Sequence, residues 1–435
     1  MQSNTGNESR GNKMRVVVIG GGAAGMMAAI TAAKENNNVK LLEKTSSLGN
    51  KVKITGKGRC NLTFEGTNEN FKENIVKNHK FMYSSFSKFD NKDVVSYFNS
   101  IGVKTKVERG GRVFPISESA EEIVIALKKE LKKYNVEIIK DSRVKKVLAI
   151  NDKVCGVELT GGKTISCDKC IVATGGKSYQ KTGSTGDGYD ISRKLGHKIV
   201  DVKPGLVPLK SNDIICKNLQ GLSLKNVELR LYEKCNPKSK IIYYGFGEML
   251  FAHFGMTGPM LLSSSSKLSR VENIDEKIKK NQIYASIDLK PALSKDILDK
   301  RLCRDFEKYA NKEFKNSLDS LLPQKLIPEI IKLSGINKDK KVHQITKKER
   351  MQLLESIKNI QINISGFMPL EMAIITTGGI DVSQINPKTM ESKIVTGLYF
   401  AGEVIDVDAY TGGYNLQIAF STAVAAGKNK KEEEK

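Results

Sequence analysis

Apolar and polar positions near the start of the chain follow the order strand, turn, helix and strand. Residues 15–19 are a short β-branched run, residues 26–34 are Ala-rich and helix-forming, and residues 39–42 are apolar again. A glycine-rich turn, Gly20-Gly-Gly-Ala-Ala-Gly25, separates the first strand from the helix. This order is typical of a parallel βαβ unit, which we predict over residues 15–43.

A longer helix and a set of short strands are expected next. Residues 119–134 carry apolar side chains on one helical face, and Ser119 with Glu122 has the spacing of a capping box. Four strands then follow, separated by Asn-Asp and Gly-Gly turns, and we expect a meander inserted in the first domain. Their expected ranges are 136–139, 144–150, 154–159 and 163–172.

The pattern changes between about residues 203 and 367, where we infer an inserted module that is part β and part α. Its second half, residues 293–358, is charged and helix-forming, with another capping box at Thr346 and Glu349. Afterwards the chain returns to apolar, glycine-punctuated sequence and ends in an apolar helix over residues 414–426.

Charge and cysteine content narrow the function classes. The 435 residues carry 71 Lys and Arg against 48 Asp and Glu, a formal charge of +23 that is spread diffusely along the chain. No segment shows basic residues interleaved with aromatic ones, so we expect no specific nucleic-acid partner. Seven scattered cysteines fit a reducing, cytoplasmic location better than a disulfide framework. The uncharged stretch 16–33 is rich in glycine, so we expect no membrane partner.

The first glycine-rich turn predicts a dinucleotide site. Gly20, Gly22 and Gly25 have the spacing G-x-G-x-x-G, which permits a tight turn, close approach of backbone N–H groups to a pyrophosphate and close helix–strand packing. Glu43 follows the second strand, where a carboxylate accepts hydrogen bonds from a ribose diol. A carboxylate there repels a 2′-phosphate, so FAD or NAD is favoured over NADP.

Two further glycine-bearing segments are candidates for the same ligand. The polar loop 44–67 is unusually rich in Gly and Lys; Lys51 and Arg59 supply charge and Asn61 hydrogen bonds for a phosphate-bearing ligand. The alternative is a solvated loop with an inert Cys60. Farther along, Ala173-Thr-Gly-Gly176 ends a strand with small residues that let the backbone approach a ligand.

The C-terminal stretch predicts contacts to a flavin. Gly402 and Glu403 follow a buried strand, at the end where open α/β sheets bind ligands, and we expect them to contact a ribityl chain. Gly412 and Gly413 precede the helix 414–426, whose N-terminus favours the negative charge of a reduced flavin. The alternative is a glycine hinge before a core helix.

The sequence offers few candidate residues for acid–base catalysis or for binding a metal. His253 is a candidate proton donor or substrate anchor, with a structural histidine as the alternative, and Tyr410 is a candidate for orienting a substrate. Cys167 and Cys170 form a C-x-x-C along an expected strand with no second pair, so we interpret them as structural and expect no metal.

The chain carries motifs that are specific in combination. Beside Lys51, they are Gly56-Lys-Gly-Arg-Cys-Asn61, Gly111-Arg-Val-Phe-Pro115, Ala173-Thr-Gly-Gly-Lys-Ser-Tyr179, Gly247-Glu-Met-Leu-Phe-Ala-His253 with Gly258-Pro259, and Ala401-Gly-Glu-Val-Ile-Asp-Val-Asp408 through Gly412-Gly-Tyr-Asn415. Together they resemble the YhiN-like family of bacterial NAD(P)/FAD-dependent oxidoreductases, which includes aminoacetone oxidase-type and bile-acid-pathway flavoproteins.

The resemblance implies an α/β fold with a Rossmann-like FAD-binding domain of the GR2 type. That domain is discontinuous, binds FAD noncovalently, and is interrupted by a β-barrel-like and a helical insert, with the substrate site where the insert meets the flavin. The implied parts are a disordered tail over 1–13, the FAD domain over 14–203 and 371–427, the β-barrel-like insert over 204–290 and 358–370, the helical insert over 291–357, and a charged tail over 428–435.

The residues and the resemblance together predict a set of FAD contacts. They are Gly20, Gly22, Ala23, Ala24, Gly25, Glu43, Lys44, Lys51, Arg59, Cys60, Asn61, Val144, Ala173, Thr174, Gly175, Gly176, Gly402, Glu403, Gly413, Asn415 and Leu416.

The leading functional hypothesis is an FAD-dependent oxidoreductase that moves a hydride between a small organic substrate and flavin. NAD(P)H or oxygen closes the cycle, and NAD(P)H would dock only transiently, because the sequence has no second G-x-G-x-x-G βαβ unit. One alternative is an RNA-associated flavoprotein of the tRNA-modifying type that uses its basic surface. Another is a structural or redox-sensing FAD. The oligomeric state stays open.

Overall fold

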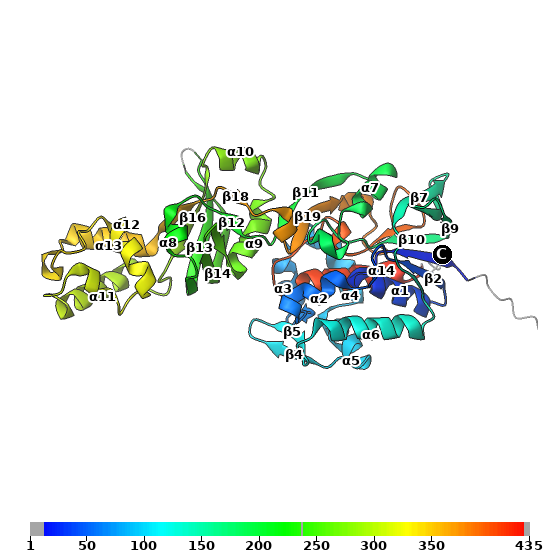
Figure 1. The fold of residues 1–435 in the computed structure, drawn as a ribbon, viewed down its shortest axis with the longest axis horizontal. Helices are drawn as coiled ribbons and strands as arrows, with labels where there is room; N and C mark the ends of the chain where they lie inside the picture. Colours follow the sequence, from blue (N-terminus) through cyan, green and yellow to red (C-terminus); the bar gives the residue numbers. More distant parts are fainter. Residues whose placement is uncertain (1–12, 236–237, 430–435) are drawn as a thin grey trace, which may run out of the picture. The chain divides into compact units, whose positions relative to one another are not determined.

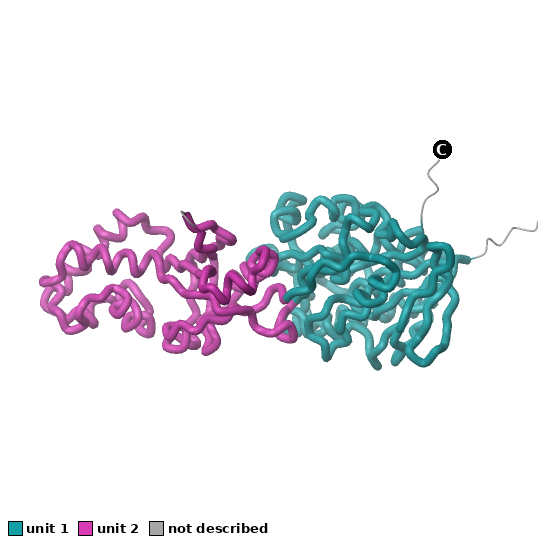
Figure 2. Tube along the Cα trace, turned by 90° about the horizontal axis from the view of Figure 1, so that it is seen from above, with its two compact units in different colours: residues 1–203, 375–435 teal, residues 204–374 magenta. Residues whose placement is uncertain are grey.

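The computed structural model describes residues 13–235 and 238–429 (Figure 1). Most of the two expected tails lies outside these residues. The chain forms two compact units, which Figure 2 shows in different colours. Unit 1 combines residues 1–203 with residues 375–435, and unit 2 is the intervening segment 204–374.

Unit 1 is built on a five-stranded parallel sheet. Its strands are β1 (Arg15–Ile19), β2 (Asn38–Leu42), β6 (Glu137–Ile139), β10 (Lys169–Val172) and β20 (Leu398–Phe400). They lie side by side in the order β20-β10-β1-β2-β6. The crossover from β1 to β2 is the predicted βαβ unit, which is confirmed, with α1 (Ala23–Lys34) as its helix.

The register brings the strand ends to one edge of the sheet. Ile19 pairs with Leu42 on one side and with Val172 on the other, and Val172 pairs with Phe400. The residues that follow these strands therefore share one edge, where doubly wound sheets bind ligands. The C-terminal helix α14 (Tyr414–Gly427) packs along α1, as Figure 1 shows.

The expected four-stranded meander is wrong in part. Only β7 (Val144–Ile150), β8 (Lys153–Leu159) and β9 (Thr164–Ser166) form an antiparallel sheet of their own. The first expected strand is β6, and the last is divided into β9 and β10. Both β6 and β10 join the parallel sheet, because β2 and β1 offer them parallel partners, which local alternation does not reveal.

One predicted capping box is absent and the other is present. At α6 (Ala120–Lys133), Ser119 occupies the cap position, but its hydroxyl caps no backbone N–H. The N–H of Glu122 donates to the Ser119 carbonyl at 3.2 Å, and the Glu122 carboxylate accepts from Ser117. At α13 (Lys347–Lys358), the hydroxyl of Thr346 accepts from the N–H of Glu349, and the Glu349 carboxylate accepts from the N–H of Thr346.

The rest of unit 1 is made of short elements around the parallel sheet. A small antiparallel sheet contains β3 (Thr63–Phe64), β4 (Thr105–Glu108) and β5 (Arg112–Pro115). The helices are α2 (Asn50–Ile54), α3 (Asn68–Asn74), α4 (Tyr83–Lys88), α5 (Asn91–Ser100) and α7 (Asp187–Lys194). A two-stranded sheet pairs β11 (Ile199–Gly205) with β19 (Ile375–Ile380), at the points where the chain leaves and re-enters unit 1.

Unit 2 contains a seven-stranded antiparallel sheet in the order β17-β16-β13-β14-β15-β12-β18. Its strands are β12 (Leu209–Lys210), β13 (Ser223–Glu233), β14 (Lys240–Ala252), β15 (Gly255–Thr257), β16 (Ile283–Asp288), β17 (Ile360–Asn363) and β18 (Gly366–Phe367). Its helices are α8 (Ile214–Asn218), α9 (Pro259–Leu268), α10 (Ile274–Lys279), α11 (Lys295–Lys308), α12 (Ile327–Ser334) and α13. The unit has its own hydrophobic core, and its division into a barrel-like and a helical insert stays a prediction.

Candidate functional site

The turn after β1 depends on Gly20 and Gly25, which no larger residue could replace without strain. A Cβ on Gly25 would lie 1.7 Å from the carbonyl oxygen of Gly20, so the helix packs against the turn only because residue 25 has no side chain. Gly20 itself has φ +102°, a backbone conformation that favours glycine. Gly22 differs, because a Cβ there would meet nothing within 4 Å. The space beside Gly22 is therefore open to a ligand.

The two glycine-bearing stretches, one near each end of the chain, meet in the fold. Gly402 follows β20 with φ +76°, and a Cβ there would lie 2.8 Å from the Cβ of Ala24 and 3.8 Å from that of Ala419. Ala24 is in the first turn of α1, and Ala419 is in α14. The end of β20 therefore lies against both helices near their N-termini.

Both helices begin without a side-chain cap. Gly22 is the cap residue of α1 and Gly413 that of α14, and neither first turn holds an acidic residue. Helix N-termini leave backbone N–H groups without helical partners and carry partial positive charge. The arrangement therefore offers two positive ends to one ligand.

Gly413 is held by the loop that the sequence singled out. With its amide oriented to satisfy both partners, the Asn61 side chain accepts from the N–H of Gly413 at 3.0 Å and donates to the carbonyl of Thr63 at 3.0 Å. A Cβ on Gly413 would lie 2.3 Å from that same Thr63 oxygen. Asn61 therefore places the start of α14 against β3.

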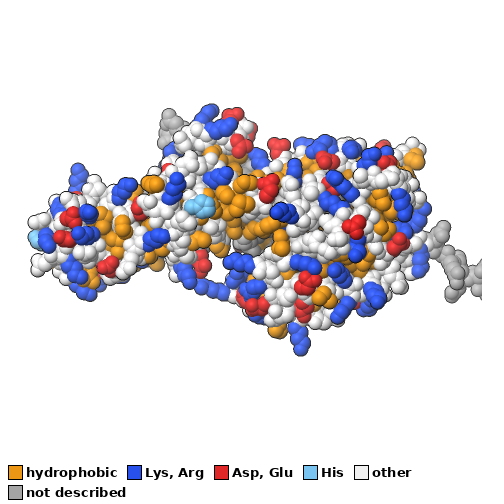
Figure 3. Space-filling model, viewed as in Figure 1, with side chains coloured by type: hydrophobic (Ala, Val, Ile, Leu, Met, Phe, Trp, Pro, Cys, Tyr) orange, Lys and Arg blue, Asp and Glu red, His pale blue; other side chains and the backbone are white. Residues whose placement is uncertain are grey.

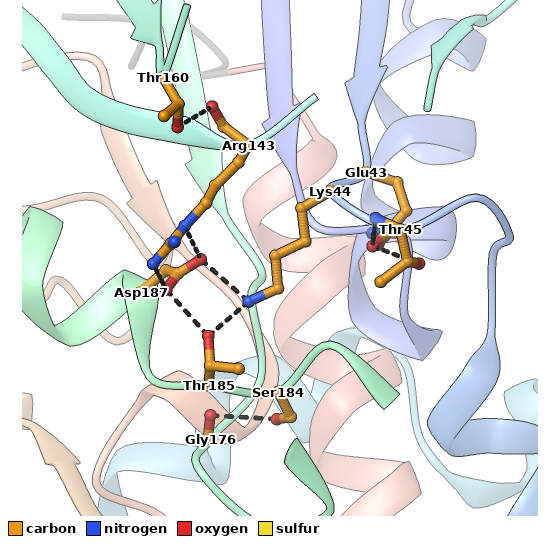
Figure 4. Close-up of polar contacts among 10 residues, drawn as sticks. Glu43, Lys44, Thr45, Arg143, Thr160, Gly176, Ser184, Thr185 and Asp187 are labelled. Atoms are coloured by element: carbon orange, nitrogen blue, oxygen red, sulfur yellow. Dashed lines mark hydrogen bonds and ion pairs between the residues drawn. The ribbon is translucent and has the colours of Figure 1, made fainter. Parts of the chain in front are cut away.

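The Glu43 carboxylate, which is buried, organises the edge beside the glycine turn. One oxygen accepts from the N–H of Gly21 at 2.7 Å. The other accepts from both the N–H and the hydroxyl of Thr45, each at 2.8 Å (Figure 4). A carboxylate has about four lone-pair sites, so these bonds leave acceptor capacity for a ribose diol.

Lys44 belongs to an ion-pair cluster that the sequence did not indicate. Its Nζ lies 3.0 Å from Oδ2 of Asp187, and Arg143 contacts Oδ1 of the same carboxylate at 2.8 Å. The Thr185 hydroxyl accepts from Lys44 and donates to Asp187 (Figure 4). Burial acts to raise the pKa of Asp187, but hydrogen bonds from Arg143 and Lys44 outweigh it and hold that pKa below its ordinary value. Val144, a predicted contact, follows Arg143 and is buried.

Glu403 forms a second cluster, at the end of β20. Its Oε2 lies 2.6 Å from Lys51 Nζ, and its Oε1 accepts from the N–H of Thr376 at 2.7 Å. Ser178 belongs to the same cluster, because its hydroxyl accepts a hydrogen bond from Lys51 Nζ at 2.7 Å. The predicted residues Lys51 and Glu403 are thus brought together, and Ser178 and Thr376, which sequence reasoning missed, hold them in place.

Small residues line the end of β10. A Cβ on Gly20 would lie 2.6 Å from the Ala173 carbonyl, and one on Gly176 would lie 2.4 Å from Thr376 Oγ1. The buried hydroxyl of Thr174 has no hydrogen-bond partner within the described structure. Gly175 has φ +71°. The Oγ1 of Thr174 lies against Gly188 of α7, where a Cβ would be 2.2 Å away.

Arg59 and Cys60 lie in the polar loop 44–67, where protein groups surround their side chains. The Arg59 guanidinium contacts the carboxylates of Glu108 and Glu118 and lies 4.2 Å from the centroid of the Phe114 ring. Its charge is therefore neutralised by protein groups, and its role as a phosphate ligand stays a prediction. Cys60 is fully buried, and burial raises the pKa of its thiol to about 11.

The loop before α14 is fixed by Asn415. Its side chain accepts from the N–H of Ala409 at 2.9 Å and donates to the carbonyl of Ala409 at 2.8 Å. It also donates to the carbonyl of Tyr410 at 3.3 Å. Leu416 is half-buried in the first turn of the helix. Asn415 thus positions Tyr410, the candidate for orienting a substrate.

The histidines and the C-x-x-C pair have distinct surroundings. His253 is exposed in the turn between β14 and β15 of unit 2, with its ring 5.1 Å from that of Phe254. His197 is buried and hydrogen-bonded to Ser392 Oγ at 2.8 Å, and burial lowers its pKa. Cys167 and Cys170 are both buried. In the described part of the chain, no group of three or more His, Cys, Asp or Glu side chains could hold a metal ion.

Taken together, the edge fits a dinucleotide such as FAD. The open space beside Gly22 and the two uncapped helix N-termini are features that an anionic pyrophosphate and a ring that gains negative charge would satisfy. They lie at the edge where the strands end.

A family model described as "HI0933-like protein Rossmann domain" matches residues 14–429. The chain belongs to the HI0933-like family. This confirms the resemblance to the YhiN-like flavoproteins and the Rossmann-type FAD-binding fold. HI0933-like membership and this fold place the chain among FAD-dependent oxidoreductases.

Curated relatives of this HI0933-like chain carry two kinds of name. "3-dehydro-bile acid delta(4,6)-reductase" from Clostridium scindens is 28% identical over 400 residues, covering 90% of this chain and 92% of that protein. "Ribosomal RNA dihydrouridine synthase" from Haemophilus influenzae is 31% identical over 392 residues, covering 89% and 91%.

Among solved structures, a 3-ketosteroid-delta4-(5alpha)-dehydrogenase from Rhodococcus jostii shares the fold. The TM-score is 0.50 with 16% identity, covering 97% of this chain and 99% of that one. Within residues 13–235 and 238–429, no helix is both long enough and apolar enough to span a bilayer.

Proposed function

We propose that this chain is a flavin-dependent reductase that transfers a hydride to a carbon–carbon double bond conjugated to a carbonyl group in a small organic substrate. Two relatives support the reaction type, because one is named for delta(4,6) reduction of a 3-dehydro bile acid and the other for synthesis of dihydrouridine. Conjugation polarises such a double bond, so its far carbon accepts the hydride while the carbonyl oxygen takes the negative charge.

The observation that carries this proposal is the convergence at Gly402. The end of β20 contacts α1 and α14 near their uncapped N-termini, at the edge where β1 and β10 also end. Such an edge suits a ligand with a pyrophosphate at one end and a ring that gains negative charge at the other.

Each group of residues has a proposed role toward FAD, which supplies the hydride when bound. N–H groups of Gly22 and Ala23 hold the pyrophosphate, and Glu43 accepts from the adenosine ribose. Glu403 contacts the ribityl chain, and the N-terminus of α14 stabilises the negative charge of the reduced ring. Binding is noncovalent.

The proton that completes the reduction has two candidate donors. Tyr410 lies in the loop that Asn415 holds, and His253 is exposed in the turn after β14. The two belong to different units, so each is tested by its own substitution. We propose NAD(P)H, docking transiently, as the source of electrons, because a reductase needs an external donor.

The test is an anaerobic half-reaction with the purified full chain. The flavin is reduced by light and then mixed with cyclohexenone or a 3-oxo-Δ4 steroid, with the saturated ketones as matched controls. We expect the enones to restore the visible absorbance of oxidised flavin and the saturated ketones to leave it bleached. NADH and NADPH are compared as reductants of the oxidised protein.

An oxidase gives the opposite pattern. If aminoacetone bleaches the oxidised flavin, oxygen restores it and no conjugated substrate reacts, the reductase proposal is wrong. The reductase proposal is also wrong if the purified protein takes up no FAD.

A second candidate substrate is a uracil base of ribosomal RNA, whose 5,6 double bond is also conjugated to a carbonyl. The relative named for dihydrouridine synthesis and the formal charge of +23 favour it. Figure 3 shows Lys and Arg side chains spread over the visible surface rather than gathered in one patch, so charge alone does not mark a site. Mass spectrometry of RNA nucleosides after turnover, with free uridine as control, tests this candidate.

A further inference from the structure

The unit 2 sheet presents an unusual outer face. Its inner face packs into the core through Leu229 and Leu231 of β13 and through Ile283 and Ile287 of β16, all fully buried. The alternating residues point to the other side, because successive side chains of a strand point to opposite faces. The outer face of an antiparallel sheet is ordinarily polar.

Cross-strand pairing places aromatic residues and a cation together on this outer face. Arg230 pairs with Tyr244 of β14, and Tyr232 pairs with Tyr284 of β16. Phe246 lies two residues beyond Tyr244 on the same side of its strand. We call these five residues the aromatic face. No single segment of the sequence displays it, because its members come from three strands.

The rings of the aromatic face are accessible. Tyr244 is 58% exposed and Phe246 is 60% exposed, values that are unusual for aromatic side chains in the middle of a strand. Grouped exposed apolar side chains mark interaction sites more often than scattered ones do.

The aromatic face is also ordered by its own contacts. The Tyr232 and Tyr284 rings stack with centroids 5.1 Å apart and planes 12° apart. The Arg230 guanidinium lies 5.8 Å from the centroid of the Tyr244 ring. A surface held in place before binding loses little conformational entropy when it binds a flat ligand.

Cations and one carboxylate lie among these rings, because Glu228 pairs with Phe246 across the strands and its Oε1 lies 2.5 Å from the Arg230 guanidinium. Residues 223–240 carry five Lys and Arg against two Glu. Lys234 Nζ lies 5.5 Å from the centroid of the Tyr284 ring. Unit 2 as a whole has 29 Lys and Arg against 19 Asp and Glu, an excess of +10. The net charge of unit 2, together with Lys234 beside the stacked tyrosines, is complementary to a polyanion whose bases can stack on the rings.

We propose that the aromatic face binds unpaired bases of single-stranded RNA, with Lys234 close to the phosphates. The inference rests on the second candidate function, reduction of a uracil base in RNA. Stacking on aromatic rings accepts any base and needs bases that are not already paired, whereas cations follow the backbone. The mixed composition of the aromatic face suits this ligand better than a purely apolar partner.

Binding of the full chain to a short fluorescein-labelled RNA tests the proposal. The probe is single-stranded, contains uridines between purines, and is compared with a duplex of the same length by fluorescence anisotropy. The double variant Tyr244→Ala, Phe246→Ala is expected to raise the Kd for the single strand at least about tenfold. Lys234→Gln is expected to lower the slope of log K against log salt by about one.

Ile297→Ala, Leu333→Ala is the matched control. These side chains are 53% and 49% exposed on α11 and α12 of the same unit, away from the sheet face. We expect this variant to bind the probe as the wild type does. Melting curves for both double variants, compared with the wild type, check that the fold is intact.

The outcomes separate this inference from the function it rests on. If the probe binds through the aromatic face but RNA never reoxidises the reduced flavin, RNA reduction fails and the binding face stands. If RNA is reduced while the aromatic variant binds like the control, the binding face is wrong. It is equally wrong if the duplex binds as tightly as the single strand, if no RNA binds, or if the aromatic variant changes only self-association in sedimentation.

Discussion

Lys51 and Glu403 form an ion pair with 2.6 Å between Nζ and Oε2, although 352 residues separate them in the chain. The pair joins the loop after β2 to the end of β20. Each side chain is only 22% exposed, so water screens the pair only in part, and removing one partner leaves the other charge partly desolvated.

Removing this pair should weaken FAD binding. Lys51→Met is expected to raise the Kd for FAD about fivefold, roughly 1 kcal/mol, because Glu403 is left without its charged partner beside the proposed ribityl site. The measurement is fluorescence titration of the apoprotein with FAD. Lys53→Met is the control, since Lys53 lies on the same helix and pairs with Glu121 at 2.9 Å. Equal affinities of the two variants would contradict the proposed site.

Two glycines of the first turn should respond differently to alanine. Gly25→Ala is expected to prevent folding, because its Cβ would lie 1.7 Å from the Gly20 oxygen. Gly22→Ala is expected to fold with an apoprotein melting temperature close to that of the wild type, because nothing lies within 4 Å, and to lose FAD affinity at least about tenfold by occupying the pyrophosphate space.

Gly161→Ala serves as the control for both, because it also has no neighbour within 4 Å and lies outside the site. Melting curves with and without FAD separate the effects. A Gly22→Ala protein that binds FAD normally would place the pyrophosphate elsewhere.

Asp187 should contribute stability that depends on pH. Its pKa in the folded protein is lowered from 3.8, so the contribution is complete above the ordinary pKa and is lost as the pH falls through the folded value. Asp187→Asn is expected to lower the free energy of unfolding by about 1–2 kcal/mol at pH 7, because two cations lose their shared carboxylate.

The difference between wild type and Asp187→Asn should shrink below about pH 4, measured by denaturant unfolding across the range. Asp190→Asn is the control, because Asp190 lies on the same helix and forms an exposed pair with Arg193. A difference that stays constant down to pH 2.5 would exclude the ion-pair explanation.

Cysteine reactivity should follow burial. Burial raises the pKa of both Cys60 and Cys216 to about 11, so few of these thiols are ionised at pH 8, whereas Cys235 is exposed. Iodoacetamide at pH 8 is expected to label Cys235 first and to label Cys60 only after denaturation. Peptide mapping by mass spectrometry gives the order, and rapid labelling of Cys60 in the folded protein would show that its loop opens.

Local chemistry made part of this structure predictable. The βαβ unit followed from the spacing of Gly20, Gly22 and Gly25 between two apolar runs, because each requirement acts over a few residues. The capping box at Thr346 and Glu349 was predictable for the same reason. At Ser119 the same spacing forms no capping box, because the Ser117 hydroxyl donates to the Glu122 carboxylate that the box requires.

Sequence patterns alone established the glycine turn, the acid after β2 and the second glycine stretch before α14, since backbone conformation and helix dipoles depend on neighbouring residues. Only the tertiary structure decided which distant side chains meet. The joining of Lys51 with Glu403, the sharing of Asp187 by Lys44 and Arg143, and the alignment of Tyr244 with Arg230 all depend on the folded chain. Such contacts arise from pairing between segments far apart in the chain, and the free energy that selects that pairing comes from the packing of the whole core rather than from any local pattern.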